Sequence, residues 1–119
     1  MAYRQKPYSG FVQRTEENTP IVKKNLGKNI NAEAGNDGKI YIDNDIKKGT
    51  TAYKKAVKHE LVHMNQMASG RADYDDNNVI WEGKKYPRKN GRVLFNGAWH
   101  EEGDHDLPWE AEAVKAENK

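Results

Sequence analysis

Three residues in the stretch AVKHELVHMNQ, residues 56–66, have types and spacing that suit metal-dependent hydrolysis. His59 and His63 are four positions apart, and on a helix such residues lie on one face with about 5–6 Å between their Cβ atoms. Two imidazoles at that separation can bind one zinc ion at about 2.0–2.1 Å. Glu60 projects about 100° away from His59 on a helix, so it can act as general base toward a water molecule beside the metal. The pattern supplies two ligands and a base, and it requires a third ligand.

Several downstream residues can supply that ligand, which must be a histidine or a carboxylate because the chain contains no cysteine. Glu110 is flanked on its helical face by apolar residues and can face the core. Glu112 projects toward a lysine-rich, solvated sector. Glu110 is therefore the preferred third ligand, and the other candidates are Glu112, His100 and His105. If none of them binds a metal, the two motif histidines form only ordinary hydrogen bonds.

The motif lies within the most regular segment of the chain. Apolar residues recur there at three- and four-residue steps, which predicts an amphipathic helix over residues 51–69. Thr50 or Thr51 can cap its start, and Gly70 can end it. Both histidines therefore lie near the middle of one rigid element.

The other elements are shorter, and their order predicts an α+β fold in a single domain, residues 1–119. Asn90-Gly91 is a hairpin signal, and Pro108 suits the first turn of a helix. The expected elements are, in chain order, an extended or loop-rich N-terminal segment (1–25), two short strands (31–34 and 39–43), the motif helix (51–69), a loop (71–78), a hairpin (79–99) and a C-terminal helix (107–118).

Composition and charge argue against several functions. The 20 basic and 18 acidic residues give a net charge of +2, without the basic excess typical of nucleic-acid binding. No apolar run approaches the roughly 20 residues that span a bilayer, and the first residues lack the apolar region of a secretory signal. We therefore expect a cytoplasmic or virion-associated protein whose partners are a peptide or protein substrate or, in an assembly, another protein.

Two motifs, in their order along the chain, resemble a known family. HELVH on a helix is followed by a Trp-containing hairpin (VIWEGKKYP) and by LPWEAEA on a later helix, which gives the order H-E-x-x-H…E-x-x-A. This order resembles the Glu-zincin (gluzincin) metallopeptidases, including small proteins of bacteria and their phages. The resemblance covers roughly residues 38–116, and only the two motifs are specific within it. In the metzincins, a Gly follows the second histidine at the position where Gln66 stands here, which excludes that class.

The resemblance implies a zincin-like fold with a small antiparallel or mixed sheet, a central motif helix and a C-terminal helix that carries the third ligand. The family's third ligand is the Glu three residues before the Ala, which corresponds to Glu110 and Ala113. In such folds an edge strand beside the motif helix pairs with an extended peptide. Residues 39–43 are therefore the expected substrate edge.

The chain also departs from the family pattern. Larger gluzincins have an Asp right after the small residue, where it supports the first histidine, but this chain has Val114 there. Either another acid does that work, for which the candidates are Asp73, Asp75, Asp76 and Asp106, or the site is weaker than that of its relatives. The residue that stabilises an oxyanion is not marked by any motif, and the candidates by type are Tyr86, His100 and His105.

These features predict a zinc-dependent metallopeptidase in which His59, His63 and Glu110 bind zinc. Glu60 is the expected general base. Two other functions remain open. One is a zincin-fold structural or binding subunit, for example of a phage particle, in which zinc stabilises a core made lean by an apolar content of 35%. The other is a metal-free domain that binds a protein partner through surfaces containing tryptophans, namely Trp81, Trp99 and Trp109, although in so polar a chain such residues favour the core.

Overall fold

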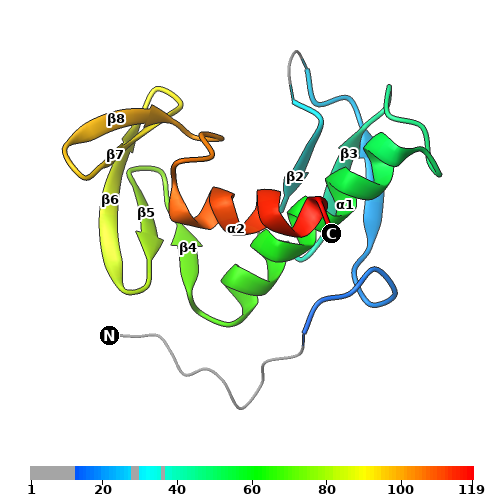
Figure 1. The fold of residues 1–119 in the computed structure, drawn as a ribbon, viewed down its shortest axis with the longest axis horizontal. Coiled ribbons are helices and arrows are strands. Elements are labelled where there is room, and N and C mark those ends of the chain that lie inside the picture. Colours follow the sequence, from blue (N-terminus) through cyan, green and yellow to red (C-terminus); the bar gives the residue numbers. More distant parts are fainter. Residues whose placement is uncertain (1–12, 28–29, 36) are drawn as a thin grey trace.

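The computed structural model describes residues 13–27, 30–35 and 37–119 (Figure 1). Two helices and two sheets make up this part of the chain, which confirms the expected α+β class. The elements are, in order, β1 (Ile21–Lys24), β2 (Ala32–Ala34), β3 (Ile40–Asp43), α1 (Thr51–Ala68), β4 (Ala72–Tyr74), β5 (Asn78–Trp81), β6 (Lys84–Lys89), β7 (Arg92–Phe95), β8 (Ala98–Glu101) and α2 (Pro108–Glu117). Of these helices, neither combines the length and apolar character that crossing a bilayer requires.

The first sheet is mixed and packs against α1. Its strand order is β1-β3-β2, with β1 parallel and β2 antiparallel to β3. Ile40 and Ile42 alternate toward one face, where they are fully buried against Val57 and Met64 of α1. The strand expected at residues 39–43 exists, but our interpretation of it as the substrate edge was wrong. β3 is the central strand of this sheet, because β2 pairs with one of its edges and β1, which comes earlier in the chain, pairs with the other.

Helix α1 begins and ends close to the expected residues. Thr50 is its N-cap, and the Thr50 hydroxyl accepts a hydrogen bond of 3.2 Å from the backbone N–H of Tyr53. The helix ends at Ala68, and Gly70 follows with φ of 82°, a left-handed conformation that a glycine adopts without strain.

The second sheet is a five-stranded antiparallel meander in the order β4-β5-β6-β7-β8. We expected residues 71–78 to be a loop and residues 79–99 to be one hairpin around Asn90-Gly91. The hairpin turn at Asn90-Gly91 is confirmed, but the loop and the single hairpin were wrong. Residues 72–74 form β4, and residues 78–101 form four strands joined by three two-residue turns. Both residues of each turn have positive φ, which matches the twist of antiparallel strands, and the turns are Glu82-Gly83, Asn90-Gly91 and Asn96-Gly97.

Helix α2 lies between the meander and α1 (Figure 1). Pro108 occupies its first turn, as expected. Leu107 and Trp109 are buried together with Trp81 of the meander in a second core, separate from the one beneath α1. The C-terminal end of α2 runs beside α1, so the two helices bring residues 59–63 and 110–117 together.

Two expectations concern the remaining segments. Of the N-terminal segment expected over residues 1–25, residues 1–12 lie outside the described residues, and the rest forms a turn that leads into β1. Of the three tryptophans, Trp81 and Trp109 are buried, whereas Trp99 is 49% exposed. A partner-binding surface made of all three is therefore excluded.

Candidate metal centre

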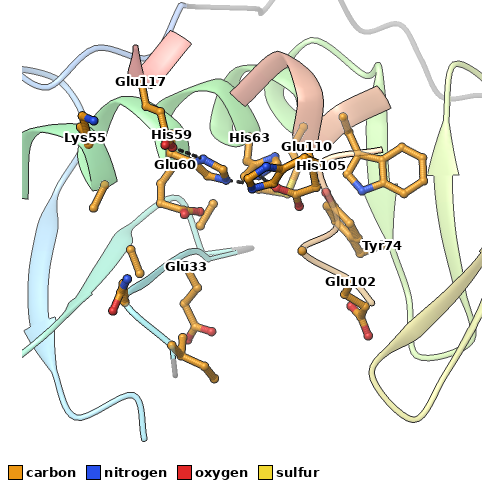
Figure 2. A pocket seen from close by; sticks show the side chains of 18 of the residues that line it. Glu33, Lys55, His59, Glu60, His63, Tyr74, Glu102, His105, Glu110 and Glu117 are labelled. Carbon is orange, nitrogen blue, oxygen red and sulfur yellow. Dashed lines mark hydrogen bonds and ion pairs between the residues drawn. The ribbon is translucent and has the colours of Figure 1, made fainter. Parts of the chain in front are cut away.

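The site is built where α1 and α2 face each other. His59 and His63 are one turn apart on α1, and their ring centroids are 5.0 Å apart. Glu110 reaches them from the first turn of α2, and its Oε1 lies 3.1 Å from the Nε2 atom of each histidine. The three potential ligand atoms all lie within 4.8 Å of one another (Figure 2). The structure thus brings together the three residues expected to bind metal.

Electrostatics in this cluster follow from mutual hydrogen bonding. Burial lowers the pKa of His59, but hydrogen bonds to Glu110 and Glu117 outweigh this and raise the pKa to about 9. The pKa of His63 is raised as well, because Glu110 outweighs burial. Burial alone would raise the pKa of Glu110, but its two histidine partners lower it to about 2. In the metal-free protein, the Nε2 atom of each histidine therefore carries a proton that faces Glu110. These two protons lie where a metal ion would bind.

The second nitrogen of His59 is held by Glu117. The Nδ1 atom of His59 lies 2.7 Å from Oε2 of Glu117, which is in the last turn of α2. This contact fixes the ring so that Nε2 points at Glu110, the arrangement seen when a carboxylate supports a metal-binding histidine. Glu117 is therefore the acid that contacts the first histidine of the motif, where we had expected one of four aspartates.

Our four candidates for that supporting acid were wrong. The carboxylate hydrogen-bonded to Nδ1 of His59 is that of Glu117, and Asp75 accepts hydrogen bonds from the backbone of its own turn. The sequence did contain the missed signal. Glu117 is seven residues after Glu110, so on a helix the two carboxylates share a face.

Glu60 has a different environment from the other acids. Its side chain is buried, with 8% exposure, and none of the described residues donates a hydrogen bond to its carboxylate. Burial raises the pKa of Glu60, and the neighbouring histidines only partly offset this. A carboxylate with a raised pKa and free oxygens is suited to accept a proton near neutral pH.

A cavity of about 820 Å³ opens beside these residues. Figure 2 shows His59, His63 and Glu110 along one wall, with Glu60 just below His59. The opposite side is formed by strand β2, which contributes Glu33, and by the segment around Glu102. The group formed by His59, His63 and Glu110 therefore borders a space large enough for a segment of peptide.

Tyr74, in β4, also lines the cavity near Glu110 (Figure 2). Burial and the nearby negative charges of Glu110 and Glu60 raise the pKa of this phenol, so it keeps its proton at neutral pH and can donate a hydrogen bond. We did not consider Tyr74 as a candidate, because we expected residues 71–78 to form a loop. Its partner in the meander, Val79, belongs to a strand that the sequence did mark.

The other residues considered from the sequence have different surroundings. Glu112 pairs with Arg71 and Gln66 rather than with the histidines. His100 is hydrogen-bonded to Asp104, and Tyr86 packs in the meander core against Phe95 and Trp109. The remaining candidate, His105, is exposed and lines the cavity.

The chemistry of this donor set fits zinc. Two imidazoles and one carboxylate are the protein ligands of a common type of catalytic zinc site. Each imidazole donates its Nδ1–H to an acceptor outside the cluster, Oε2 of Glu117 or Oε1 of Gln66, which leaves both Nε2 atoms for a metal. Among the described residues, this group offers three ligand side chains, so a zinc ion held by them would keep a fourth position for water or substrate.

Comparison of the chain with protein-family models, with curated proteins and with solved structures finds no match.

Proposed function

We propose that the protein is a small zinc-dependent peptidase of the gluzincin type, with zinc held by His59, His63 and Glu110. The observation that carries this proposal is the convergence of these three side chains beside a buried acid, Glu60, at the wall of a large cavity. A zinc ion in such a site polarises a carbonyl group and lowers the pKa of water toward 7.

The chain's own residues would then divide the remaining work. Glu60 takes the proton of the attacking water and returns it to the leaving amine, as its raised pKa permits. The protonated phenol of Tyr74 donates a hydrogen bond to the oxygen on which negative charge develops. Among the described residues, β2 pairs only with β3, and its other edge borders the cavity, so β2 rather than β3 can add a peptide strand.

A structural role for zinc is the main alternative. Structural zinc sites are closed by four protein ligands, whereas catalytic sites keep one position for water or substrate. The three-residue group at the described site favours the second type. It supports hydrolysis over a zinc that only stabilises a subunit.

The test compares zinc content and hydrolysis in the same variants. Untagged wild-type protein should contain one zinc per chain by elemental analysis, and His59→Ala and Glu110→Ala should lose it. Glu60→Gln should keep its zinc and lower kcat on a quenched fluorescent peptide library about 100-fold or more. Glu101→Gln is the control, because the Glu101 side chain is 74% exposed on β8. A Glu60→Gln protein that cleaves as fast as the control would refute the proposed mechanism.

A further inference from the structure

Gln66 is the most deeply buried polar side chain at the site, with 2% exposure. It lies one turn after His63 on α1, on the side of the ring away from Glu110. Its Oε1 lies 3.0 Å from Nδ1 of His63, and its Nε2 donates to the backbone oxygen of Trp109 and to Glu112 Oε1, both at 3.1 Å. A buried amide with this many partners is fixed in position.

The partners also fix which way the amide points. The Trp109 carbonyl oxygen and the Glu112 carboxylate can only accept hydrogen bonds, so the atom facing them must be the NH₂ group of Gln66. The amide oxygen must therefore face His63, where it can only accept. Nδ1 of His63 consequently carries a proton, so a zinc ion that displaced the proton of Nε2 would meet the Nδ1–H tautomer of this ring.

The amide is anchored in turn by an ion pair that reaches the surface. Both carboxylate oxygens of Glu112 accept from the Arg71 guanidinium, at 3.1 and 2.7 Å. Arg71 also donates to Glu82 in the first turn of the meander and lies over the ring of Trp81, 4.8 Å from its centroid. A continuous chain of contacts thus joins the meander surface to His63.

We propose that Gln66 is a positioning residue that sets the orientation and tautomer of His63 for zinc, and that Glu112 and Arg71 hold Gln66 in place. This inference rests on the proposed zinc site and adds to it. The two histidines are then supported in chemically different ways. His59 donates to a carboxylate that makes its ring a stronger base, whereas His63 donates to a neutral amide that adds no charge.

The test measures zinc affinity by competition with a chelator in a set of matched variants. Gln66→Met keeps the length of the side chain and removes its amide, and should raise the Kd for zinc 10- to 100-fold. Glu117→Gln calibrates the scale, because it weakens the support of the other histidine. Asn65→Ala removes an amide from the neighbouring position, which contacts the backbone of Arg14 rather than the site, and should change the Kd less than twofold.

A second readout reports the imidazole itself. In ¹⁵N-edited spectra of the zinc-loaded protein, the Nδ1–H signal of His63 should exchange slowly with water in the wild type and in Asn65→Ala. It should be lost in Gln66→Met, because no acceptor then holds the proton. A role of Gln66 in packing alone would not remove this signal.

A charge-preserving swap covers the case in which Gln66→Met does not fold. Gln66→Glu alone places two carboxylates against each other and should weaken zinc binding. Adding Glu112→Gln restores a donor between the two positions and should return the Kd to within about threefold of wild type, given that a carboxylate can also accept from Nδ1. Arg71→Met should raise the Kd a few-fold, since it removes only the outer anchor.

The outcomes separate the two proposals. Absence of zinc from the wild type would overturn both of them. Normal zinc binding by the wild type, together with an unchanged Kd and an unchanged His63 signal in Gln66→Met, would overturn the positioning role alone. Failure of the swap to recover the loss caused by Gln66→Glu would also count against it.

Discussion

The core of the half that contains β1–β3 and α1 is built mainly from aliphatic side chains, whereas the core of the half that contains β4–β8 and α2 is centred on a pair of tryptophans. Ile40, Ile42 and Val57 belong to the first core. In the second core, the rings of Trp81 and Trp109 have centroids 5.8 Å apart and pack among smaller aliphatic side chains. The contacts that join the halves around the site are polar instead, and they run from His59, His63 and Gln66 to residues of α2.

This difference shows how a small, highly charged chain can organise a site. Each half has an apolar core of its own, so the residues between the halves do not have to be apolar. Two of the proposed metal ligands come from one half, and the third comes from the other. A metal bound there would connect the two cores, and its contribution to stability would depend on both being folded.

The largest effect should come from damage to one core. Trp109→Ala is expected to lower the free energy of unfolding by about 3–5 kcal/mol, because it leaves a large cavity among Trp81, Tyr86 and Phe95. Urea denaturation measures this change. The control is Trp99→Ala, which removes a half-exposed tryptophan on β8 of the adjoining meander and should cost much less. Equal costs for the two variants would contradict the assignment of the core.

Zinc should stabilise the contact between the two halves of the molecule. At a free zinc concentration 100 times its Kd, the free energy of unfolding should rise by about 2.7 kcal/mol, because the ion binds only when both helices are in place. Thermal and urea denaturation with zinc and with a chelator measure this gain. The Glu110→Ala variant should show none of it. A gain of the same size in that variant would place the bound zinc elsewhere.

The smallest effect concerns pH in the metal-free protein. The pKa of His59 is raised from 6.5 to about 9, so its contribution to stability is complete below pH 6.5 and is lost as the pH rises through about 9. The pKa of Glu110 is lowered from 4.5 to about 2, so its contribution is complete above pH 4.5 and is lost as the pH falls through about 2. The contribution of this pair should therefore be greatest between about pH 4.5 and 6.5.

Urea denaturation at a series of pH values, with a chelator present, measures this profile. Glu110→Gln should flatten it by about 1.5–2 kcal/mol, at the low end of the range for hydrogen bonds that involve charged groups. An unchanged profile in Glu110→Gln would mean that other groups determine the pH dependence of stability.

Local patterns in the sequence predicted the two helices well, and they also singled out three residues, His59, His63 and Glu110, that the structure brings together. Helix α1 follows from its apolar periodicity and from Thr50, and Glu110 follows from its apolar flanks and the family order. We predicted too few strands in the meander, because Asn90-Gly91 was the only one of its turns that we recognised in the sequence. Asn96-Gly97 is the same dipeptide, and Glu82-Gly83 places at a left-handed position a residue type that rarely marks such a turn.

Other features depend on contacts between distant segments, which periodicity does not report. The central position of β3 results from its parallel pairing with β1, a strand that precedes it by about 20 residues. In the sequence, Gln66 served only to exclude the metzincin class. Its contact with His63 depends on a carbonyl and a carboxylate supplied by α2, so the sequence alone could not reveal it.

The three two-residue turns of the meander have a consequence for the order of assembly. Hairpins closed by such turns form on a timescale of about 1–10 μs, because only neighbouring residues have to meet. The parallel pairing of β1 with β3 and the meeting of α1 with α2 join residues much farther apart along the chain, about 50 positions in the case of His59 and Glu110, and so form later. We therefore expect the metal-binding pocket to be among the last parts of the protein to assemble, after the meander has formed.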